Sequence, residues 1–363
     1  MSRFTECKLG ELVQITGGGT PSRIISEYWD GDIPWVTVKD FTSKNIVTAQ
    51  EKITEIGLKN SASNLIPAHS ILMPTRMALG KIAINSIPVA INQDIKALNI
   101  LDKDRLNSKY LVSYLSTISN EIENAGKGAT VKGIKLDFLK DLSIPLPPLP
   151  EQVAIANLLS KADALIAKRK ESLALLDAYL KSTFLEMFGD PVRNEKGWEV
   201  KRLGDVVHLR AGQFVSASEI QSNFTQGLYS CYGGNGRRGY VKTFTHDGEF
   251  VLIGRQGALC GNVKVAKGQF HATEHAVVCS PKIFFETSWL YYLLEIINLN
   301  KYASGAAQPG LTVGKLEQID IIFAPLELQN QFAAVVEKVE ALKEKYHKSL
   351  GELENLYGSL SQR

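Results

Sequence analysis

PLPPLPEQVAIANLLSKADALIAKRKESLALLDAYLKSTFLEMFGD, residues 145–190, is the stretch that decides the fold of this chain. Its proline run ends one domain, and no glycine or proline follows Pro150 until Gly189, so we predict a long helix over 149–189. Apolar residues recur along it at steps of four and three, with seven-residue steps past Arg169 and from Leu180 to Met187: Ile155, Leu159, Ala162, Ile166, Leu173, Leu176, Leu180 and Met187. This heptad pattern is typical of a coiled coil, so the helix needs a partner helix.

The chain contains an internal repeat with a period of about 180 residues, which is long enough for a domain followed by a helix. KLGELVQITGGGTPSR from Lys8 resembles RLGDVVHLRAGQFVSA from Arg202. LKDLSIPLPPLPEQVAIA from Leu139 aligns without gaps on LEQIDIIFAPLELQNQFA from Leu316, which matches Gln152 with Gln329. Matching blocks in the same order, each ending in a proline and a long helix, indicate a duplication.

The second long helix supplies the partner for the first. Its expected seam consists of Val335, Val339, Leu342, Tyr346, Leu353, Leu356 and Leu360. Arg169 and Tyr346 interrupt the apolar seams, and they either fix the helix register or point outward. The region before each helix reads as short strands separated by Gly, Pro, Asn and Asp, closed by a helix over about 108–124 and 287–298.

These patterns predict an α+β fold: two similar mixed α/β globular domains separated by a long antiparallel two-helix coiled coil, with a pseudo-twofold repeat. The expected boundaries are 1–148 for the first domain, 149–189 for the first long helix, 190–326 for the second domain and 327–363 for the second helix.

Composition places the chain among ordinary folded proteins without a strongly charged tail. It has 363 residues, 44% hydrophobic residues and a formal net charge of +3, so any contact with nucleic acid must use local patches. Its four cysteines are widely spaced and contain no C-x-x-C pair, which indicates reduced thiols. No window approaches eighteen apolar residues, so we expect a cytoplasmic protein without a membrane partner.

The sequence motifs that resemble catalytic or metal sites fail on context, so no catalytic or metal-binding residues are predicted. HATEH over 271–275 matches the H-x-x-E-H spelling of a zinc site, but that site needs a helix and the flanking residues are typical of strands. Asp190 with Glu199 and Lys201 loosely resembles a nuclease acidic set, yet no hydrophobic strand precedes Asp190. The glycine-rich segments lack the P-loop spacing, and no amino-methyltransferase motif is present.

Polar and basic residues in turns and between strands are the remaining candidates for function. Arg, Asn and Gln are the types that bind base edges in the major groove, whereas Lys, Ser and Thr suit phosphates. The predicted DNA-binding residues are Thr20, Ser22, Arg23, Lys39, Arg76, Lys81, Asn92, Gln93, Tyr232, Asn235, Arg237, Arg238, Lys242, Arg255 and Gln256. Thr75, Gln213 and Gln308 belong to the same wider group. From these residues alone, DNA binding and protein–protein scaffolding both remain open.

The order of these segments resembles the specificity (S) subunit of type I restriction–modification systems over essentially the whole chain. The most specific pieces are the IPLPPLPEQ joint, the MFGDP segment from Met187 followed by Trp198, the Asn92-Gln93 pair, and GRQGALCGNV from Gly254. The second joint departs from the family pattern, with Ala324 in place of a proline and Leu328 in place of a glutamate.

The resemblance implies a subunit without enzymatic activity or cofactors of its own. Each globular unit would be a target-recognition domain that reads one half of a split double-stranded DNA sequence, and the helices would act as a ruler for the spacer. Its partners would be two methyltransferase subunits, which use S-adenosylmethionine, and motor–nuclease restriction subunits, which use ATP and magnesium. The alternative readings are a coiled-coil scaffold that does not bind DNA and a stand-alone nuclease.

Overall fold

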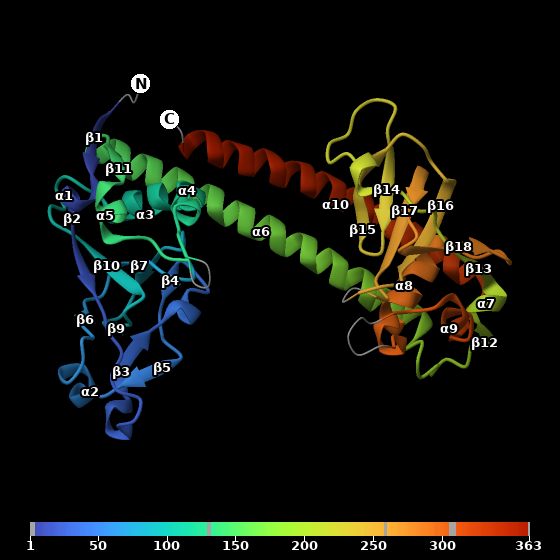
Figure 1. The fold of residues 1–363 in the computed structure, drawn as a ribbon, viewed down its shortest axis with the longest axis horizontal. Coiled ribbons are helices and arrows are strands. Elements are labelled where there is room, and N and C mark those ends of the chain that lie inside the picture. Colours follow the sequence, from blue (N-terminus) through green and yellow to red (C-terminus); the bar gives the residue numbers. More distant parts are fainter. Residues whose placement is uncertain (1–3, 129–131, 258–259, 305–309, 362–363) are drawn as a thin grey trace. The chain divides into compact units, whose positions relative to one another are not determined.

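The computed structural model describes residues 4–128, 132–257, 260–304 and 310–361. The chain divides into two compact units, Met1–Arg169 with Ser349–Arg363 and Lys170–Lys348. Each unit holds one globular region and parts of both long helices, α6 (Leu149–Phe188) and α10 (Leu326–Ser361) (Figure 1). Among the described residues, no helix has the length and apolar character that crossing a membrane requires.

The first unit builds its globular region from two small sheets and a two-stranded ribbon. The five-stranded sheet has the order β2-β10-β7-β8-β4 and the four-stranded sheet the order β5-β3-β9-β6, while β1 pairs with β11. The strands are β1 Thr5–Lys8, β2 Val13–Gly17, β3 Trp29–Val36, β4 Asn45–Ile46, β5 Glu51–Ile53, β6 Leu65–Ile66, β7 Ile71–Pro74, β8 Ala83–Asn85, β9 Val89–Ile91, β10 Ile95–Ile100 and β11 Ser143–Leu146. The helices are α1 Leu9–Leu12, η1 Ser26–Tyr28, η2 Val38–Asp40, α2 Glu55–Lys59, α3 Ser108–Thr117, α4 Ser119–Asn124 and α5 Leu136–Asp141.

The second unit gathers most of its strands into one sheet. This six-stranded sheet has the order β13-β18-β16-β17-β14-β15, and β12 pairs with β19 as β1 does with β11. The strands are β12 Glu199–Arg202, β13 Val207–Ala211, β14 Tyr229–Gly233, β15 Gly236–Val241, β16 His246–Gly254, β17 Val263–Ala272, β18 Ala276–Pro281 and β19 Asp320–Phe323. The helices are α7 Leu203–Val206, η3 Ala217–Glu219, α8 Thr287–Ile297, η4 Leu299–Tyr302 and α9 Val313–Glu317.

Each unit has a core in which the globular region packs on a long helix. In the first unit, buried residues of α3 and α5 pack on β2, β7 and β10, and Ala156 of α6 joins the same cluster. In the second unit, Trp289 and Leu293 of α8 pack on the sheet, and the cluster extends to Phe184 of α6 and Phe332 of α10. Burying these large side chains stabilises each unit by removing apolar surface from water.

The two long helices run antiparallel where they pack together. Within the second unit, Phe184 and Phe188 of α6 contact Phe332 of α10 with ring centroids 5.4 and 5.7 Å apart. Asp177, earlier in α6, instead pairs with Lys343, later in α10, at 2.8 Å. Residue numbers therefore rise along one helix as they fall along the other. The two repeated α/β regions and the paired helices confirm the predicted fold class.

The seam of α10 differs from the predicted one. Leu342 and Leu356 are 36% and 50% exposed, whereas the next residues, Lys343 and Tyr357, are partly buried. The predicted seam was wrong at these positions. Lys343 takes the place of Leu342 because it pairs with Asp177 of α6 and also with Glu340 at 2.7 Å, and Tyr357 takes the place of Leu356 beside Asp163 of α6. Burial alone would lower the pKa of Lys343, but its hydrogen bonds to the two carboxylates raise that pKa above the ordinary value.

The predicted helix over 108–124 is interrupted. Helix α3 ends at Thr117 and α4 starts at Ser119, because Ile118 leaves the helical region with φ −95° and ψ 15°. The equivalent helix of the second unit, α8, is continuous to Ile297, as expected.

Candidate DNA-recognition surfaces

Both globular regions contain the same turn, which we call the tip turn: residues 92–94 between β9 and β10, and residues 273–275 between β17 and β18. Its first backbone N–H donates to the end of a parallel neighbour, Asn92 to Val36 at 3.1 Å and Thr273 to Tyr232 at 2.8 Å. Its last carbonyl accepts from the residue after a central strand, Asp94 from Thr75 at 2.7 Å and His275 from Arg255 at 3.1 Å. The two turns therefore occupy equivalent positions in the repeat.

A glycine lets the chain cross directly behind each tip turn. A Cβ at Gly18 would lie 2.0 Å from the carbonyl oxygen of Ile91, and one at Gly212 would lie 2.1 Å from that of Ala272. The following residues hydrogen-bond to these same oxygens, Gly19 at 3.0 Å and Gln213 at 2.8 Å. This close approach places Thr20 beside the first tip turn and Phe214 at the equivalent position beside the second.

Around the first tip turn, the structure brings together four predicted site residues. Gln93 is exposed, and its Oε1 accepts a hydrogen bond from Thr20 Oγ1. Arg76 Nη1 pairs with Asp94 at 3.4 Å and remains 54% exposed, so its guanidinium can also reach a ligand. Asn92 is different: it is 6% exposed, and its Oδ1 accepts from the N–H of Asp94 at 3.1 Å. Asn92 therefore stabilises the turn through a buried side-chain hydrogen bond.

Around the second tip turn, the nearest predicted residues are basic. The N–H of Arg255 bonds the turn itself, and the Arg238 side chain and the Thr273 hydroxyl both lie against Gly233. Arg237 and Arg238 are neighbours on β15, where the pairing with β14 shifts: Cys231 lies opposite Gly239 but Tyr232 lies opposite Arg237, which leaves Arg238 as the extra residue of a β-bulge. Arg237 lies over the ring of Tyr240, with 5.1 Å from its guanidinium carbon to the ring centroid.

The remaining predicted residues of the second unit surround this surface. Tyr232, at the end of β14, packs edge-on against Phe270 with ring centroids 5.6 Å apart. Asn235 lies in the β14–β15 turn and accepts from Asn262 Nδ2 at 2.8 Å. Gln256 forms a backbone bridge with Gly310, and Lys242 is exposed directly after β15. Gln308 lies outside the described residues.

Other predicted residues of the first unit lie away from the tip turn. Arg23 pairs with Glu51, which lowers the pKa of that carboxyl group, and stacks 3.7 Å from the centroid of the Trp29 ring. The Ser22 carbonyl accepts from the Trp29 indole at 3.1 Å, and Lys39 is part of η2. These three residues form a second polar patch, next to β3 and β5.

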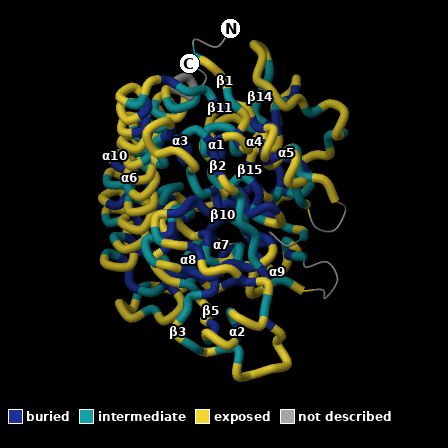
Figure 2. The backbone as a smooth tube through the Cα atoms, turned by 90° about the vertical axis from the view of Figure 1, so that its left-hand side faces the viewer, coloured by how far each residue is buried: buried dark blue, intermediate teal, exposed yellow. Residues whose placement is uncertain are grey.

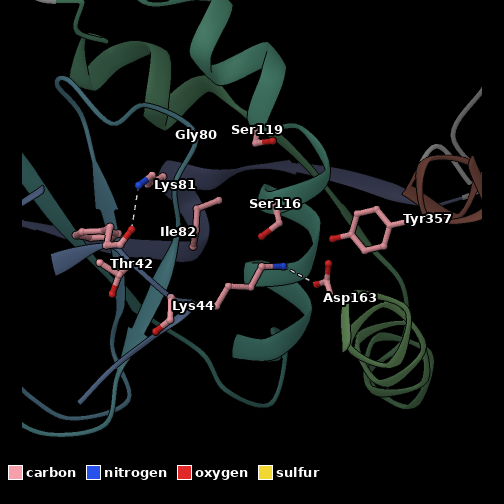
Figure 3. A pocket seen from close by; sticks show the side chains of 11 residues that line it. Thr42, Lys44, Gly80, Lys81, Ile82, Ser116, Ser119, Asp163 and Tyr357 are labelled. Carbon is pink, nitrogen blue, oxygen red and sulfur yellow. Dashed lines mark hydrogen bonds and ion pairs between the residues drawn. The ribbon is translucent and has the colours of Figure 1, made fainter. Parts of the chain in front are cut away.

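Lys81 lines a cavity of about 400 Å³ between the first globular region and the long helices (Figure 3). Its ammonium donates to the carbonyl of Phe41 at 3.0 Å, and Lys44 forms an ion pair with Asp163 of α6. Burial, reinforced by Asp163, raises the pKa of Tyr357 of α10 to about 12. The ion pair of Lys44 with Asp163 therefore anchors the domain to α6, whereas Lys81 lines the same cavity as an exposed residue and bonds within the domain.

The second unit has a comparable anchor, lined by Tyr291 of α8 together with Asp177, Glu340 and Lys343 of the long helices, around a cavity of about 610 Å³. Burial, followed by the nearby carboxylates, raises the pKa of Tyr291 to about 12. Lys181 of α6 adds an ion pair with Glu295 of α8 at 3.3 Å.

Glu274 and Phe214 were not predicted from the sequence, although both lie at the second tip turn. The sequence predicted strand residues rather than a metal site for HATEH, and the segment proves to be the end of β17 followed by the turn. His271 is 5% exposed, and its Nε2 lies 3.1 Å from the carbonyl oxygen of Gln213. In the part of the chain that the structure describes, no group of three or more His, Cys, Asp or Glu is placed to hold a metal ion.

The protein has two similar α/β domains attached to paired helices. Each domain presents a turn with different polar side chains, which is the arrangement expected of a protein that recognises a ligand with two separate parts. The family model for the type I restriction modification DNA specificity domain matches residues 1–175 and 195–355. The chain is 35% identical over 351 residues to the EcoprrI specificity subunit of Escherichia coli, covering 92% of this chain and 87% of that protein. It is 28% identical to the MjaIX specificity subunit of Methanocaldococcus jannaschii, covering 91% and 85%.

Solved structures show the same fold. The S subunit of a type I restriction–modification system from M. genitalium matches 99% of this chain and 95% of its own with a TM-score of 0.65 at 18% identity. A chain from a structure of complex assembly and conformational transition of the type I R-M system matches with a TM-score of 0.53 at 19% identity, covering 99% and 96%.

The chain belongs to the family of type I restriction–modification specificity subunits. It is the DNA specificity subunit of such a system, the component that is not catalytic.

Proposed function

We propose that each globular region is a target-recognition domain that reads one half of a bipartite double-stranded DNA site through the surface around its tip turn. The observation that carries this proposal is one backbone frame built twice with different side chains at the same positions. A pair of readers with a common frame and different contacts suits a site with two dissimilar halves. The functional segments we propose are 1–148 and 190–326 for the readers, with 149–189 and 327–363 for the helices.

The side chains around the tip turns suit the chemistry of base edges and phosphates. Within this proposal, Arg76, Arg238 and Arg255 would contact guanine edges or adjacent phosphates, and Gln93 would contact adenine. A second group would contact DNA at the margins of the surface: Thr20, Ser22, Arg23, Lys39, Asn235, Arg237, Lys242 and Gln256. Lys81 is exposed and would contact a phosphate, whereas Asn92 supports the turn, because it is buried and accepts from the N–H of Asp94.

We assign the long helices two tasks, fixing the length of the DNA spacer and binding the partner subunits. The backbone of α6 and α10 is exposed along much of its length (Figure 2). Helix α6 buries Leu159, Leu173 and Leu180 but leaves large apolar residues exposed, among them Leu158, Leu165, Leu175 and Tyr179. Apolar side chains that stay exposed on a packed helix pair favour a protein partner. We propose two methyltransferase subunits, which carry S-adenosylmethionine, and restriction subunits, which carry ATP and magnesium, as those partners in the cytoplasm.

Domain exchange tests the two-reader proposal. Residues 190–326 are replaced by the equivalent segment of a homologous specificity subunit, and methylated adenines are mapped in the genome of a host that carries the chain and its methyltransferase subunit. We expect one half of a bipartite motif to change and the other to stay. A change in both halves, or in neither, contradicts the proposal, and a scaffold without DNA function would give no salt-dependent DNA retention by the assembled complex.

Insertion of one heptad into each long helix tests the spacer. Seven residues placed after Lys170 in α6 and after Lys348 in α10 preserve the helix seam and add about 10.5 Å. At about 3.4 Å per base pair, the spacer should lengthen by about three base pairs while both half-sites keep their sequence. An unchanged spacer in an active complex would exclude the ruler role.

A further inference from the structure

We propose that Gln93 and Glu274, at equivalent positions of the two tip turns, are specificity-determining residues that select bases by opposite hydrogen-bonding rules. Gln93 would recognise adenine, and Glu274 a base that presents an exocyclic amino group in the major groove, N4 of cytosine or N6 of adenine. This inference rests on the proposed reading of DNA through the tip turns, and it assigns to Glu274 a role that its sequence motif did not suggest.

The equivalence of the two residues follows from the backbone around them. Each is the central residue of a turn whose first N–H and last carbonyl bond to equivalent neighbouring strands. In each domain the crossing glycine lies behind the residue just before the turn, Ile91 or Ala272. Gln93 and Glu274 therefore project from the same place on the same frame, although Gln93 is exposed and Glu274 is partly buried.

Gln93 offers both a donor and an acceptor. Its Oε1 accepts from Thr20 Oγ1, and a carbonyl oxygen has a second lone pair for another donor. The Thr20 hydroxyl thereby fixes the orientation of the amide. A glutamine held in this way can accept from N6 of adenine and donate to N7, the bidentate pairing that distinguishes adenine from other bases.

Glu274 offers acceptors only. Its Oε1 lies 3.1 Å from Nε2 of His275, while its Oε2 is buried and has no hydrogen-bond partner among the described residues. A buried acceptor without a donor is unfavourable, so a ligand that supplies an N–H is favoured there. The Glu274 side chain is 33% exposed, so a rotation of the carboxylate can bring Oε2 to the surface.

The surroundings of Glu274 suit contact with DNA despite its negative charge. The Arg238 side chain and the Thr273 hydroxyl of the tip turn both lie against Gly233. Burial raises the pKa of the nearby Cys231 thiol; Arg238 opposes this rise and Glu274 adds to it. Arg238 can thus attract the phosphates that Glu274 alone would repel. Phe214, at the position equivalent to Thr20, is 76% exposed and can contact a thymine methyl group. A carboxylate beside these groups rejects the O6 and N7 acceptors of guanine.

The test exchanges the two chemistries: Glu274→Gln in one variant and Gln93→Glu in another. Each is expressed in full length with its methyltransferase subunit, and methylated adenines are mapped across the host genome. We expect E274Q to lower discrimination at one position of the half-site read by 190–326 about tenfold or more. We expect Q93E to do so at one position of the other half-site. The base demanded by the wild-type chain at the position changed in E274Q distinguishes cytosine from adenine.

Matched controls separate base reading from general effects of charge and packing. Glu249→Gln removes a carboxylate that pairs with Lys267 on the second sheet, and Gln14→Glu adds one at the exposed far end of β2. Both should leave every position of the motif unchanged. Glu274→Asp keeps the acceptors, so it should keep the demanded base while reducing methylation. Thermal unfolding of each variant identifies any loss of fold, and the reciprocal variant in the other domain then decides the test.

The two proposals fail in different ways. If exchange of 190–326 changes one half-site but E274Q and Q93E leave every position unchanged in active complexes, the tip-turn assignment is wrong and the two-reader proposal stands. If E274Q alters both half-sites, or all positions of one half-site equally, Glu274 acts on folding or assembly and the assignment is also wrong. If domain exchange itself changes neither half, the two-reader proposal is wrong.

Discussion

The two globular regions keep the same small frame inside differently built sheets. The first has separate sheets of five and four strands, and the second has one sheet of six. Both nevertheless retain a parallel strand pair beside the tip turn, β3 with β9 and β14 with β17. The contacts preserved through this change are those that place the turn and attach the domain to a helix. The comparison therefore separates residues that maintain the frame from residues that are available for recognition.

A buried glutamine provides the clearest example of a frame residue. Gln152 Oε1 accepts from the N–H of Asn107 at 2.8 Å, and its Nε2 donates to the carbonyls of Arg105 and Pro147. Gln329 Oε1 accepts from the N–H of Glu286 at 2.9 Å, and its Nε2 donates to the carbonyl of Ala324. Each amide joins the start of a long helix to the start of a domain helix.

Alanine at Gly18 or Gly212 should produce the largest loss of stability. The new Cβ would meet a backbone oxygen, which cannot move without displacing the tip turn, so we expect a loss of about 3 kcal/mol or more in the free energy of unfolding. Urea unfolding measures it. Gly314→Ala is the control, because a Cβ there meets nothing within 4 Å and alanine favours the helix. If G18A and G212A unfold like G314A, the shared frame is not what holds the turns.

Alanine at the buried glutamines should rank next. Removing the amide strands buried backbone groups without partners, so we expect about 2 kcal/mol at either site. Q152A should lose more than Q329A, because Gln152 makes three of these hydrogen bonds and Gln329 two. Gln331→Ala, on the exposed face of α10, should change the unfolding midpoint little. Equal losses at all three positions would contradict the proposed role of the two buried amides.

The sequence predicted these shared structural positions because they occur in both copies of the internal repeat. The proline joint aligned Gln152 with Gln329, and helix α10 begins at Leu326, the equivalent of Leu149, despite Ala324 and Leu328 in its joint. The alignment from Lys8 and Arg202 also paired Gly18 with Gly212 in the register that the structure has. Local patterning carries such information, since helix periodicity and chain reversals depend on neighbouring residues.

What sequence could not predict depends on contacts between distant residues. Lys343 takes a seam position of α10 because it pairs with Asp177 on α6. A pattern of apolar residues along one helix cannot predict an ion pair with the other helix. Asn92 resembled a base reader, yet it is buried within its own turn. Glu274 drew attention only through the spelling of a metal motif. Its equivalence to Gln93 appears only when the strands are paired, so the sequence could not predict it. The frame was therefore predictable, and the exposed residues around it were much less so.

Acid should destabilise the second unit. In the second unit, burial and the nearby His271 lower the pKa of His246 below its ordinary value, and its ring stacks on Phe270 with centroids 5.3 Å apart. The unfolded chain then binds a proton near pH 6.5 that the folded unit does not, so stability is full above that pH and falls below it. His246→Phe should weaken the fall in unfolding temperature between pH 7 and 5. His208→Phe, at an exposed position of β13, is the control and should not. Equal pH dependence in wild type and H246F would refute this origin.

Lysine at the margin of the reading surface should have the smallest effect. Lys242 is exposed after β15, and a contact with one phosphate would contribute through the release of counterions rather than through base recognition. We therefore expect K242A, assembled with its methyltransferase subunit, to keep the methylated motif and to bind DNA a few-fold more weakly. The slope of log affinity against log salt should fall by about 1. The control is Lys103→Ala. Lys103 lies in the loop after β10, at the end of that strand opposite the first tip turn, so this change should leave the slope unaltered. A changed motif in K242A would show that Lys242 contacts a base. An unchanged slope would show that it does not contact DNA. Either result would contradict the assignment of Lys242 to a phosphate.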